Sequence, residues 1–340
     1  MEFTFGICSY NSEKYIIELL ESIRYQVDNY ADENIATCLV VSDDCSQDNT
    51  MEYIECWLKK YENLFSAVKL LKSSENKGVV YNYIRLIKNI HTTYFKTIDG
   101  DDMISSYDIY RQAQNTDNEK MNIYATIRMK DAETYIDEKD YIDMFYYSHY
   151  VHTNKKDVTL IETTKPFITP EVCLNRKYYT EDCLNSMSEY IMFEDDTSLL
   201  YIMRRNKRMT LNYILEPMIL YRVHDMSLSN GRTSASQICF LDDYHRFKKY
   251  IWKTTRTAWG KTFATTAVIL SFLQKHRFSI RKTLCIKIMK SINDRNKRRA
   301  YRNKEFVTFK KEYDELVKKQ NEYIDYINDE AKLFRKGNLK

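Results

Sequence analysis

Segments with strand-like and helix-like patterns alternate from Phe3 to Ile98, and this alternation restricts the chain to a small group of folds. Strands are predicted at four short apolar runs: Phe3–Ser9, Ile35–Ser42, Ala67–Leu71 and Tyr94–Ile98. In the three intervening segments, apolar residues recur at helical spacing: Ser12–Val27, Asn49–Tyr61 and Gly78–Ile90. Helices of this length between strands predict an α/β fold with a parallel, doubly wound sheet.

Polar clusters follow three of the predicted strands, at the point where each strand ends. They are Ser9-Tyr10-Asn11, Asp43-Asp44 and Asp99-Gly100-Asp101-Asp102. Because the carboxyl ends of parallel strands meet at one edge of the sheet, and ligands bind beyond that edge, we expect the three clusters to converge on one site.

The loop from Asp99 to Asp102 places three carboxylates around Gly100. Carboxylates at alternate positions of a turn can reach one hard cation, and Mg²⁺ or Mn²⁺ held there would bridge the protein to diphosphate oxygens. An acidic turn is the simpler interpretation, but the position after a strand favours a ligand site. His224 is a further candidate metal ligand, although a lone His is more often structural, and Arg222 beside it offers a guanidinium for phosphate.

Two other acidic groups have both a functional and a structural interpretation. Asp43 and Asp44 could accept hydrogen bonds from a nucleoside base or ribose, whereas Ser46 or Asp48 could cap the following helix. The acidic run from Glu194 to Asp196 precedes a helical segment, where acids favour the helix dipole. Clustered acids also raise one another's pKa, which suits a general base.

The later part of the chain changes from alternating elements to helices alone. Strands are predicted at Asn122–Lys130 and Ile214–Tyr221, a helix at Ser198–Asn206, and only helices from Ser234 onward. We therefore expect an α/β domain over residues 1–230 and an α-helical C-terminal region over residues 231–340.

The C-terminal region is strongly basic, although the chain of 340 residues carries a formal net charge of only +4. Between Arg246 and Lys311, 20 Lys and Arg residues stand against two acids, interleaved with aromatic and aliphatic residues. This pattern favours an interfacial helix on an anionic membrane surface; a helical appendage packed on the α/β domain is the alternative. Nucleic acid is a weaker alternative, because no recognised nucleic-acid motif accompanies the basic residues.

Three features bear on compartment and assembly. The eight cysteines have no CxxC spacing, and the first residues lack the pattern of a secretory signal. The apolar run Thr262–Gln274 is shorter than the roughly 20 residues that span a bilayer. We expect a cytoplasmic protein, soluble or peripheral at the inner face of the plasma membrane. The mixed-charge segment Glu312–Leu333 is a candidate pairing surface for a homo-oligomer.

Six short strings occur in order over roughly the first 230 residues: Phe5–Tyr15, Val40–Thr50, Glu75–Val79, Asp99–Asp102, Phe193–Asp195 and Tyr221–Ser229. Together they resemble the motifs of glycosyltransferase family 2. They are similar, in turn, to its opening strand, its VDDGSTDNT-like string, its NxG turn, its DXD metal motif, its ED base motif and its closing YRxHxxSxS string. Each string alone is common, but the ordered set is specific.

The resemblance implies a GT-A fold and inverting transfer from a nucleotide sugar, most often a UDP-sugar. The acceptor would be a hydroxyl of a saccharide or lipid-linked molecule in bacterial surface polysaccharide synthesis. It implies that Asp195, beside Glu194, deprotonates the acceptor. The metal, Mn²⁺ or Mg²⁺, would be held by residues among Asp99, Asp101, Asp102 and His224. The donor-binding residues that it implies are Ser9, Tyr10, Asn11, Asp43, Asp44, Lys77, Gly78, Asn82, Asp99, Gly100 and Arg222.

Three segments depart from the family pattern. Cys45 stands where the family usually has Gly, Asn82-Tyr83-Ile84 replaces a string that contains Arg, and residues 164–192 lack a Gly-rich acceptor loop. Two other functions stay open. A sugar-nucleotide nucleotidylyltransferase usually needs a Gly-rich basic loop, which Ser9–Ser12 lacks. A non-catalytic membrane or nucleic-acid adaptor would be a decayed transferase, and the intact acids argue against decay.

Overall fold

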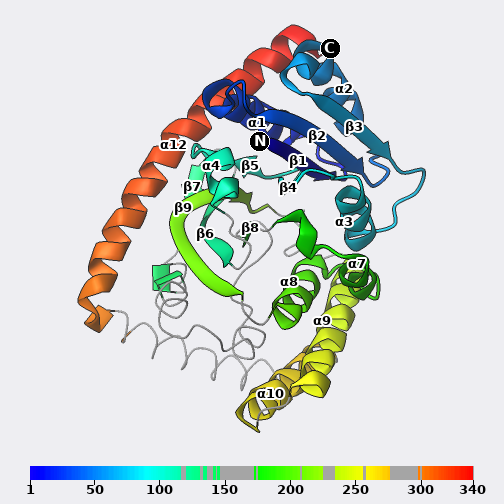
Figure 1. Ribbon diagram of the computed structural model, residues 1–340, viewed down its shortest axis with the longest axis vertical. Helices are drawn as coiled ribbons and strands as arrows, with labels where there is room; N and C mark the ends of the chain where they lie inside the picture. Colours follow the sequence, from blue (N-terminus) through cyan, green and yellow to red (C-terminus); the bar gives the residue numbers. More distant parts are fainter. Residues whose placement is uncertain are drawn as a thin grey trace.

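The computed structural model describes residues 1–115, 120–130, 133–135, 141–142, 144–145, 172–173, 175–206, 209–224, 234–255, 258–275, 298 and 301–339. Its first sheet is parallel, with strand order β3-β2-β1-β4 (Figure 1). The strands are β1 (Glu2–Ser9), β2 (Ala36–Asp43), β3 (Ala67–Lys72) and β4 (Tyr94–Asp99). All four predicted strands are therefore confirmed, each to within one residue at either end.

Helices cover both faces of this sheet, as the alternation predicts. α1 (Ile16–Tyr30) and α2 (Thr50–Tyr61) share a buried core with Phe3, Phe5 and Ile7 of β1. α3 (Val79–Lys88) packs on the opposite face, and η1 (Glu62–Leu64) follows α2. Gly6 allows α3 and the residues after it to approach closely, because a Cβ at that position would lie 3.3 Å from Cδ2 of Leu86 in α3 and 2.9 Å from Cδ1 of Ile90.

A second sheet of mixed direction lies beside the first (Figure 1). Its strand order is β5-β9-β6-β7, and β8 also pairs with β6. Its strands are β5 (Met103–Ile104), β6 (Lys120–Lys130), β7 (Glu133–Tyr135), β8 (Val172–Cys173) and β9 (Thr210–Arg222). Both predicted strands of this region are confirmed, as parts of β6 and β9. Because β5 directly follows the Asp99–Asp102 loop and pairs with β9, the end of β9 is brought to that loop.

The remaining helices are α4 (Ile109–Gln114), η3 (Arg176–Tyr178), α7 (Glu181–Met187), α8 (Glu194–Arg205), α9 (Ser234–Thr254), α10 (Ala258–Lys275) and α12 (Lys304–Asn338). The elements described from Ser234 onward are thus all helices, as predicted. α9 and α10 form a hairpin that extends away from the two sheets (Figure 1). Within the described ranges, no helix combines the length and the apolar character needed to cross a bilayer.

The long helix α12 returns along the edge of the α/β domain and packs against α1 (Figure 1). A buried residue occurs at every seventh position: Phe306, Tyr313, Gln320, Ile327 and Phe334. Seven residues make nearly two helical turns, so these side chains form one line along the helix. The amide of Gln320 exchanges hydrogen bonds with Ser106, at 2.8 and 3.0 Å. This face is therefore occupied by the chain's own core, and the predicted pairing surface stays a prediction for the outward face.

Phe334→Ala tests whether α12 is part of the α/β core. Phe334 is 3% exposed and packs in the same cluster as β1, whereas its neighbour Leu333 is 63% exposed. Loss of a buried phenyl ring and the resulting cavity should lower the free energy of unfolding by about 3–5 kcal/mol. Leu333→Ala should change it by less than about 0.5 kcal/mol. Urea unfolding measures both; equal effects would contradict this packing.

Candidate active site

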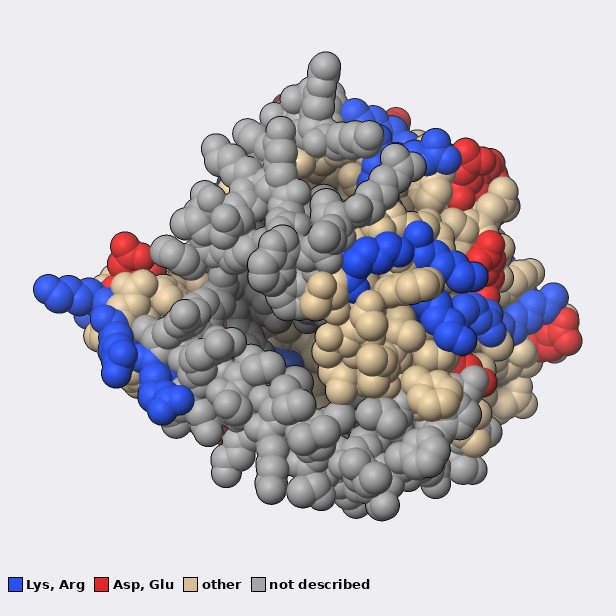
Figure 2. Space-filling model, turned by 90° about the horizontal axis from the view of Figure 1, so that it is seen from below, with Lys and Arg blue, Asp and Glu red and all other residues tan. Residues whose placement is uncertain are grey.

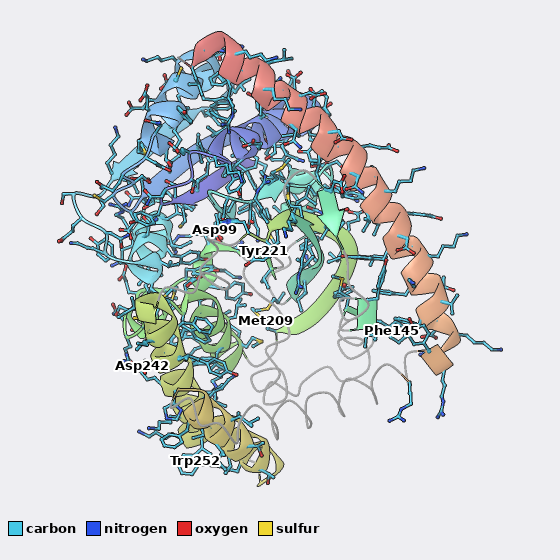
Figure 3. All side chains as sticks on the ribbon, turned by 180° about the vertical axis from the view of Figure 1, so that it is seen from behind. Asp99, Phe145, Met209, Tyr221, Asp242 and Trp252 are labelled. Carbon is cyan, nitrogen blue, oxygen red and sulfur yellow. The ribbon has the colours of Figure 1, made fainter. Side chains whose placement is uncertain are left out.

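The carboxyl ends of β1, β2 and β4 converge, as the sequence predicted. Ser9 is in register with Asp43, and Cys8 is in register with Asp99. The Ser9 hydroxyl donates to Oδ1 of Asp43 at 3.0 Å, and the Gly100 amide donates to the Cys8 carbonyl at 2.8 Å. Figure 3 labels Asp99 at this edge, where the first sheet meets the second.

Asp43 and Asp44 are 2% and 3% exposed and hold the neighbouring loops in place. Asp43 accepts hydrogen bonds from the Ser9 hydroxyl and from the amide and hydroxyl of Ser46. Asp44 accepts from the backbone amides of Lys77 and Gly78, at 2.9 and 2.7 Å. Such charge-assisted bonds fix loop geometry. Both carboxylates therefore fix the loops at this edge of the sheet.

The alternative interpretation of the loop after β2 was that Ser46 or Asp48 caps the following helix, α2, and the structure agrees with it in part. The N-cap of α2 is Asn49, which makes no side-chain capping bond. Ser46 instead bonds Asp43 and the amide of Asn11, so capping by Ser46 is wrong. Asp48 does serve the helix start, because its Oδ1 accepts from the amide of Thr50 at 3.0 Å.

The other predicted donor-binding residues near this edge differ in exposure. Asn82 is buried and donates to the Ser42 carbonyl at 2.8 Å, which ties α3 to β2. Tyr10 is 47% exposed, and Lys77 forms an ion pair with Glu75 at 3.0 Å. The Oδ1 of Asn11 accepts from the amide of Gln47 at 2.8 Å. Tyr10, Asn11 and Lys77 are thus the exposed residues of this group.

Arg85 was not predicted as a site residue. It lies near the strand ends and directly follows Asn82-Tyr83-Ile84, the string that lacks the arginine of the family pattern. Its Nη2 donates to the carbonyls of Asp43 and Leu71, at 2.7 and 3.1 Å, and its Nε donates to the Ser42 hydroxyl. Arg85 lies one helical turn after Asn82, on the same face of α3. That spacing was the signal in the sequence that could have identified it.

The end of β9 joins the acidic loop through three contacts. The Arg222 amide donates to Oδ1 of Asp102 at 2.8 Å, and the Arg222 Nε donates to the Asp101 carbonyl at 2.7 Å. Nε2 of His224 lies 2.8 Å from Oδ2 of Asp101, across 123 residues of sequence. The structure therefore brings together Asp101, Asp102, Arg222 and His224. Residues 225–229 of the closing string lie outside the described residues.

Tyr15 lies against this junction and was not predicted as a site residue. The guanidinium of Arg222 is 4.3 Å from the centre of the Tyr15 ring, and the ring centres of Tyr15 and His224 are 5.1 Å apart. A cation over an aromatic face is attracted by the ring quadrupole. Its signal in the sequence was its place at the end of the Phe5–Tyr15 string.

Gly100 has a steric reason to be glycine. A Cβ at this position would lie 2.6 Å from the hydroxyl of Ser12 and 3.3 Å from Cβ of Ser9. The acidic loop can therefore lie directly on the segment after β1 only without a side chain at residue 100.

Glu194 begins α8 close to the same edge. Burial raises the pKa of the Cys8 thiol, and the negative charges of Asp99 and Glu194 raise it further. Glu194 thus lies within electrostatic reach of the ends of β1 and β4. The backbone of Asp195 and Asp196 lies in the first turn of α8, but their side chains are outside the described part of the structure.

Residues 4–208 match the family model for glycosyl transferase family 2. The chain belongs to glycosyl transferase family 2. It is a nucleotide-sugar-dependent glycosyltransferase with a GT-A fold. No curated protein matches the chain closely enough to extend this comparison.

Solved structures agree with the family 2 fold. TarS of S. aureus, residues 1–349 in complex with UDP-GlcNAc, matches with a TM-score of 0.52 and 17% identity, over 81% of this chain and 73% of that chain. The mannosyltransferase PcManGT of Pyrobaculum calidifontis, in complex with GDP-Man and Mn²⁺, matches with a TM-score of 0.52 and 12% identity, over 99% and 88% of the two chains. At these identities the likeness concerns the fold.

The backbone conformation of Cys45 bears on one departure from the family 2 pattern. Cys45 has a φ of +65°, in the left-handed region, where the family usually places Gly. A residue with a Cβ costs roughly 1–2 kcal/mol in this conformation. The loop therefore keeps the glycine geometry without the glycine. The residues 164–171, at the start of the segment without a Gly-rich loop, lie outside the described residues.

The residues of this family 2 site fit a divalent cation by their chemistry. Asp99 is exposed at the end of β4, and the side chains of Asp101 and His224 are 30% and 18% exposed. Carboxylate and imidazole groups are suitable ligands for a divalent metal. Among the described residues, however, no three His, Cys, Asp or Glu side chains are already arranged around one point.

Asp102 differs from its acidic neighbours. It is 1% exposed, and one of its oxygens accepts the Arg222 amide. Burial raises the pKa of Asp102, and the carboxylates of Asp101 and Asp99 raise it further. Asp102 therefore connects the acidic loop to the end of β9 through this hydrogen bond.

Proposed function

We propose that this glycosyltransferase moves a sugar from a UDP-sugar to a hydroxyl of a saccharide or lipid-linked acceptor in bacterial surface polysaccharide synthesis, with inversion at the transferred carbon. The contact between Asp101 and His224, beside the converging strand ends, carries the proposal, because it joins two motifs from opposite ends of the catalytic domain. Support for the donor class comes from TarS, solved with UDP-GlcNAc, and from PcManGT, solved with GDP-Man.

Asp99, Asp101 and His224 would hold Mn²⁺ or Mg²⁺, and Asp102 would keep β9 attached to the acidic loop. When bound, the cation would stabilise the negative charge of the departing diphosphate as a Lewis acid. Arg222, held by the Asp101 carbonyl and the Tyr15 ring, would neutralise part of the same charge. PcManGT, crystallised with Mn²⁺, supports a divalent metal in this fold.

Asp195 would accept the proton of the acceptor hydroxyl, with Glu194 beside it. The position of α8 supports this role, because its first turn starts near the ends of β1 and β4. A carboxylate base takes the proton as the oxygen attacks the sugar carbon from the side opposite the diphosphate.

The nucleoside end of the donor would lie along the edge formed by the loops after β1 and β2. The residues proposed to bind or shape it are Ser9, Tyr10, Asn11, Asp43, Asp44, Lys77, Gly78, Asn82 and Gly100. Of these, the exposed Tyr10, Asn11 and Lys77 are the natural direct contacts, since Asp43 and Asp44 already bind their own loops.

A donor screen tests the proposed function. The melting temperature of the protein is measured with UDP-, GDP-, dTDP- and CMP-linked sugars, each with and without Mn²⁺, followed by donor turnover for any that bind. Stabilisation by a UDP-sugar that requires Mn²⁺, together with release of UDP, is the expected result. Release of pyrophosphate from a sugar phosphate and a nucleoside triphosphate would instead identify a nucleotidylyltransferase. Binding without any turnover would favour the non-catalytic adaptor.

Residues 246–311 were predicted to bind a membrane surface, and much of the described part of this segment lies in the α9–α10 hairpin. The exposed aromatic and aliphatic residues Tyr250, Trp252, Ile269 and Phe272 lie on it, as do the exposed bases Lys249 and Lys253. Figure 2 shows basic side chains among uncharged ones over this hairpin. Residues 256–257, 276–297 and 299–300 of the segment lie outside the described residues. We propose that the hairpin docks on an anionic membrane surface and holds the site near a lipid-linked acceptor.

Reversing two charges on the hairpin should weaken this docking. Each Lys near an anionic surface contributes about 1 kcal/mol, so Lys249→Glu with Lys253→Glu should lower binding to anionic vesicles by at least roughly 30-fold. Lys318→Glu with Lys336→Glu, an equal charge change on α12, is the matched control. Co-sedimentation with vesicles of phosphatidylglycerol and phosphatidylcholine measures the effect. Equal loss in both double variants, or equal binding to neutral vesicles, would contradict the proposal.

A further inference from the structure

The segment Glu189–Phe193, here called the hinge segment, leads directly into α8, the helix that carries the proposed base. It also contacts the turn at Gly78, where the donor is proposed to bind. The Ile191 carbonyl accepts a hydrogen bond from the Val80 amide at 3.2 Å. Cγ2 of Ile191 lies 3.3 Å from the position that a Cβ would take at Gly78. Glu194 follows directly as the first residue of α8. A shift of the hinge segment would therefore move both sides of the site.

One buried carboxylate from α9 holds this segment. Oδ2 of Asp243 accepts hydrogen bonds from the backbone amides of Ile191 and Met192, at 2.7 and 2.9 Å. Asp243 is 1% exposed. Hydrogen bonds to an ionised acceptor are stronger than neutral ones, and burial keeps water from competing for the two amides. Asp243 thus fixes the direction of the chain just before α8.

Neighbouring contacts on α9 reinforce this attachment. Nη1 of Arg246 donates to the Glu189 carbonyl at 2.6 Å and lies 3.9 Å from Oδ1 of Asp243. The Phe193 ring packs against three aromatic rings of α9, those of Phe240, Tyr244 and Phe247, with ring centres 5.2 to 5.9 Å apart. Figure 3 labels Asp242, the neighbour of Asp243, part-way along α9, and Trp252 near the end of α9 that lies far from the sheets.

We propose that Asp243 is a positioning residue for transfer, acting through the hinge segment on the base helix α8 and on the Gly78 turn. The proposal rests on the proposed function. It assigns to α9, which lies in the predicted C-terminal region, a part in the geometry of the catalytic site. Misplacement of a reacting group by about 1 Å can lower a rate by roughly 100-fold, so a small movement of this segment is enough to affect turnover.

The test compares Asp243→Ala and Asp243→Asn with Asp329→Ala, the same change at an acid on α12 that is 73% exposed. Hydrogen exchange of peptides that cover Glu189–Phe193 reports the hinge segment directly. Donor turnover is measured at saturating nucleotide sugar, at a temperature where circular dichroism shows every variant fully folded. In Asp243→Ala, amide exchange in the segment should be at least about tenfold faster and kcat about 10–100-fold lower.

Asp243→Asn keeps one acceptor oxygen and should fall between wild type and Asp243→Ala in both measurements, while Asp329→Ala should match wild type. A merely structural role would lower the melting temperature without lowering kcat of the folded enzyme. Unchanged exchange in the hinge segment of Asp243→Ala, or a kcat equal to that of Asp329→Ala, would overturn the proposal. The turnover of the unmutated enzyme tests the proposed function separately, since exchange is measured without a donor.

Discussion

Asp101→Ala is expected to weaken the divalent-dependent binding of nucleoside diphosphate at least about 100-fold, because it removes a carboxylate proposed to hold the cation. Losing even a group that only orients a metal ligand costs 10–100-fold, and losing a ligand should cost more. Oδ2 of Asp101 lies 2.8 Å from Nε2 of His224, so the change also removes this contact. The Asp101 carbonyl still accepts from Arg222 in the variant, which keeps β9 attached to the acidic loop.

Titration with UDP in the presence and absence of Mn²⁺ measures this effect. Asp329→Ala, at an acid that is 73% exposed on α12, is the matched control and should bind as wild type does. The melting temperature of each variant without ligand checks the fold. Mn²⁺-dependent binding of normal strength in folded Asp101→Ala would remove Asp101 from the proposed ligands.

Asp195→Asn is expected to lower transfer by about 100-fold or more while donor binding survives. The amide keeps the shape of the side chain but cannot accept the acceptor's proton, and a positioned general base contributes roughly 10²–10⁴-fold. Because Asp195 lies in the first turn of α8, an uncharged amide at this position is compatible with the helix. Donor affinity should be retained, since the proposed diphosphate and metal ligands lie at or just after the ends of β4 and β9.

Parallel variants at the two neighbouring acids make this experiment specific. Glu194→Gln and Asp196→Asn carry the same kind of change one residue away on either side. Transfer rates at saturating donor, together with Mn²⁺-dependent UDP binding, are compared across all three variants. If Asp195→Asn turns over normally and one of the neighbours does not, the base is that neighbour.

The elements of the first sheet could be predicted because their signals are local. A strand or a helix is encoded in the spacing of apolar residues over a few positions, and the strings at Phe5–Tyr15 and Val40–Thr50 mark where strands end. Parallel pairing then brings those ends together, so the convergence of Ser9, Asp43 and Asp99 followed from the sequence. The family also followed, because six motifs occurred in order.

The tertiary structure alone decided which distant residues meet. The contact of Asp101 with His224 depends on the pairing of β5 with β9, and the stacking of Tyr15 on Arg222 depends on where α1 begins. Likewise, the sequence after residue 234 predicted helices but not their partners. A helical pattern specifies which face is buried and leaves open what covers it. The packing of α12 on α1 and the hydrogen bonds from the hinge segment to Asp243 therefore could not be predicted from the sequence pattern. They depend on the complementarity of whole surfaces in the folded chain.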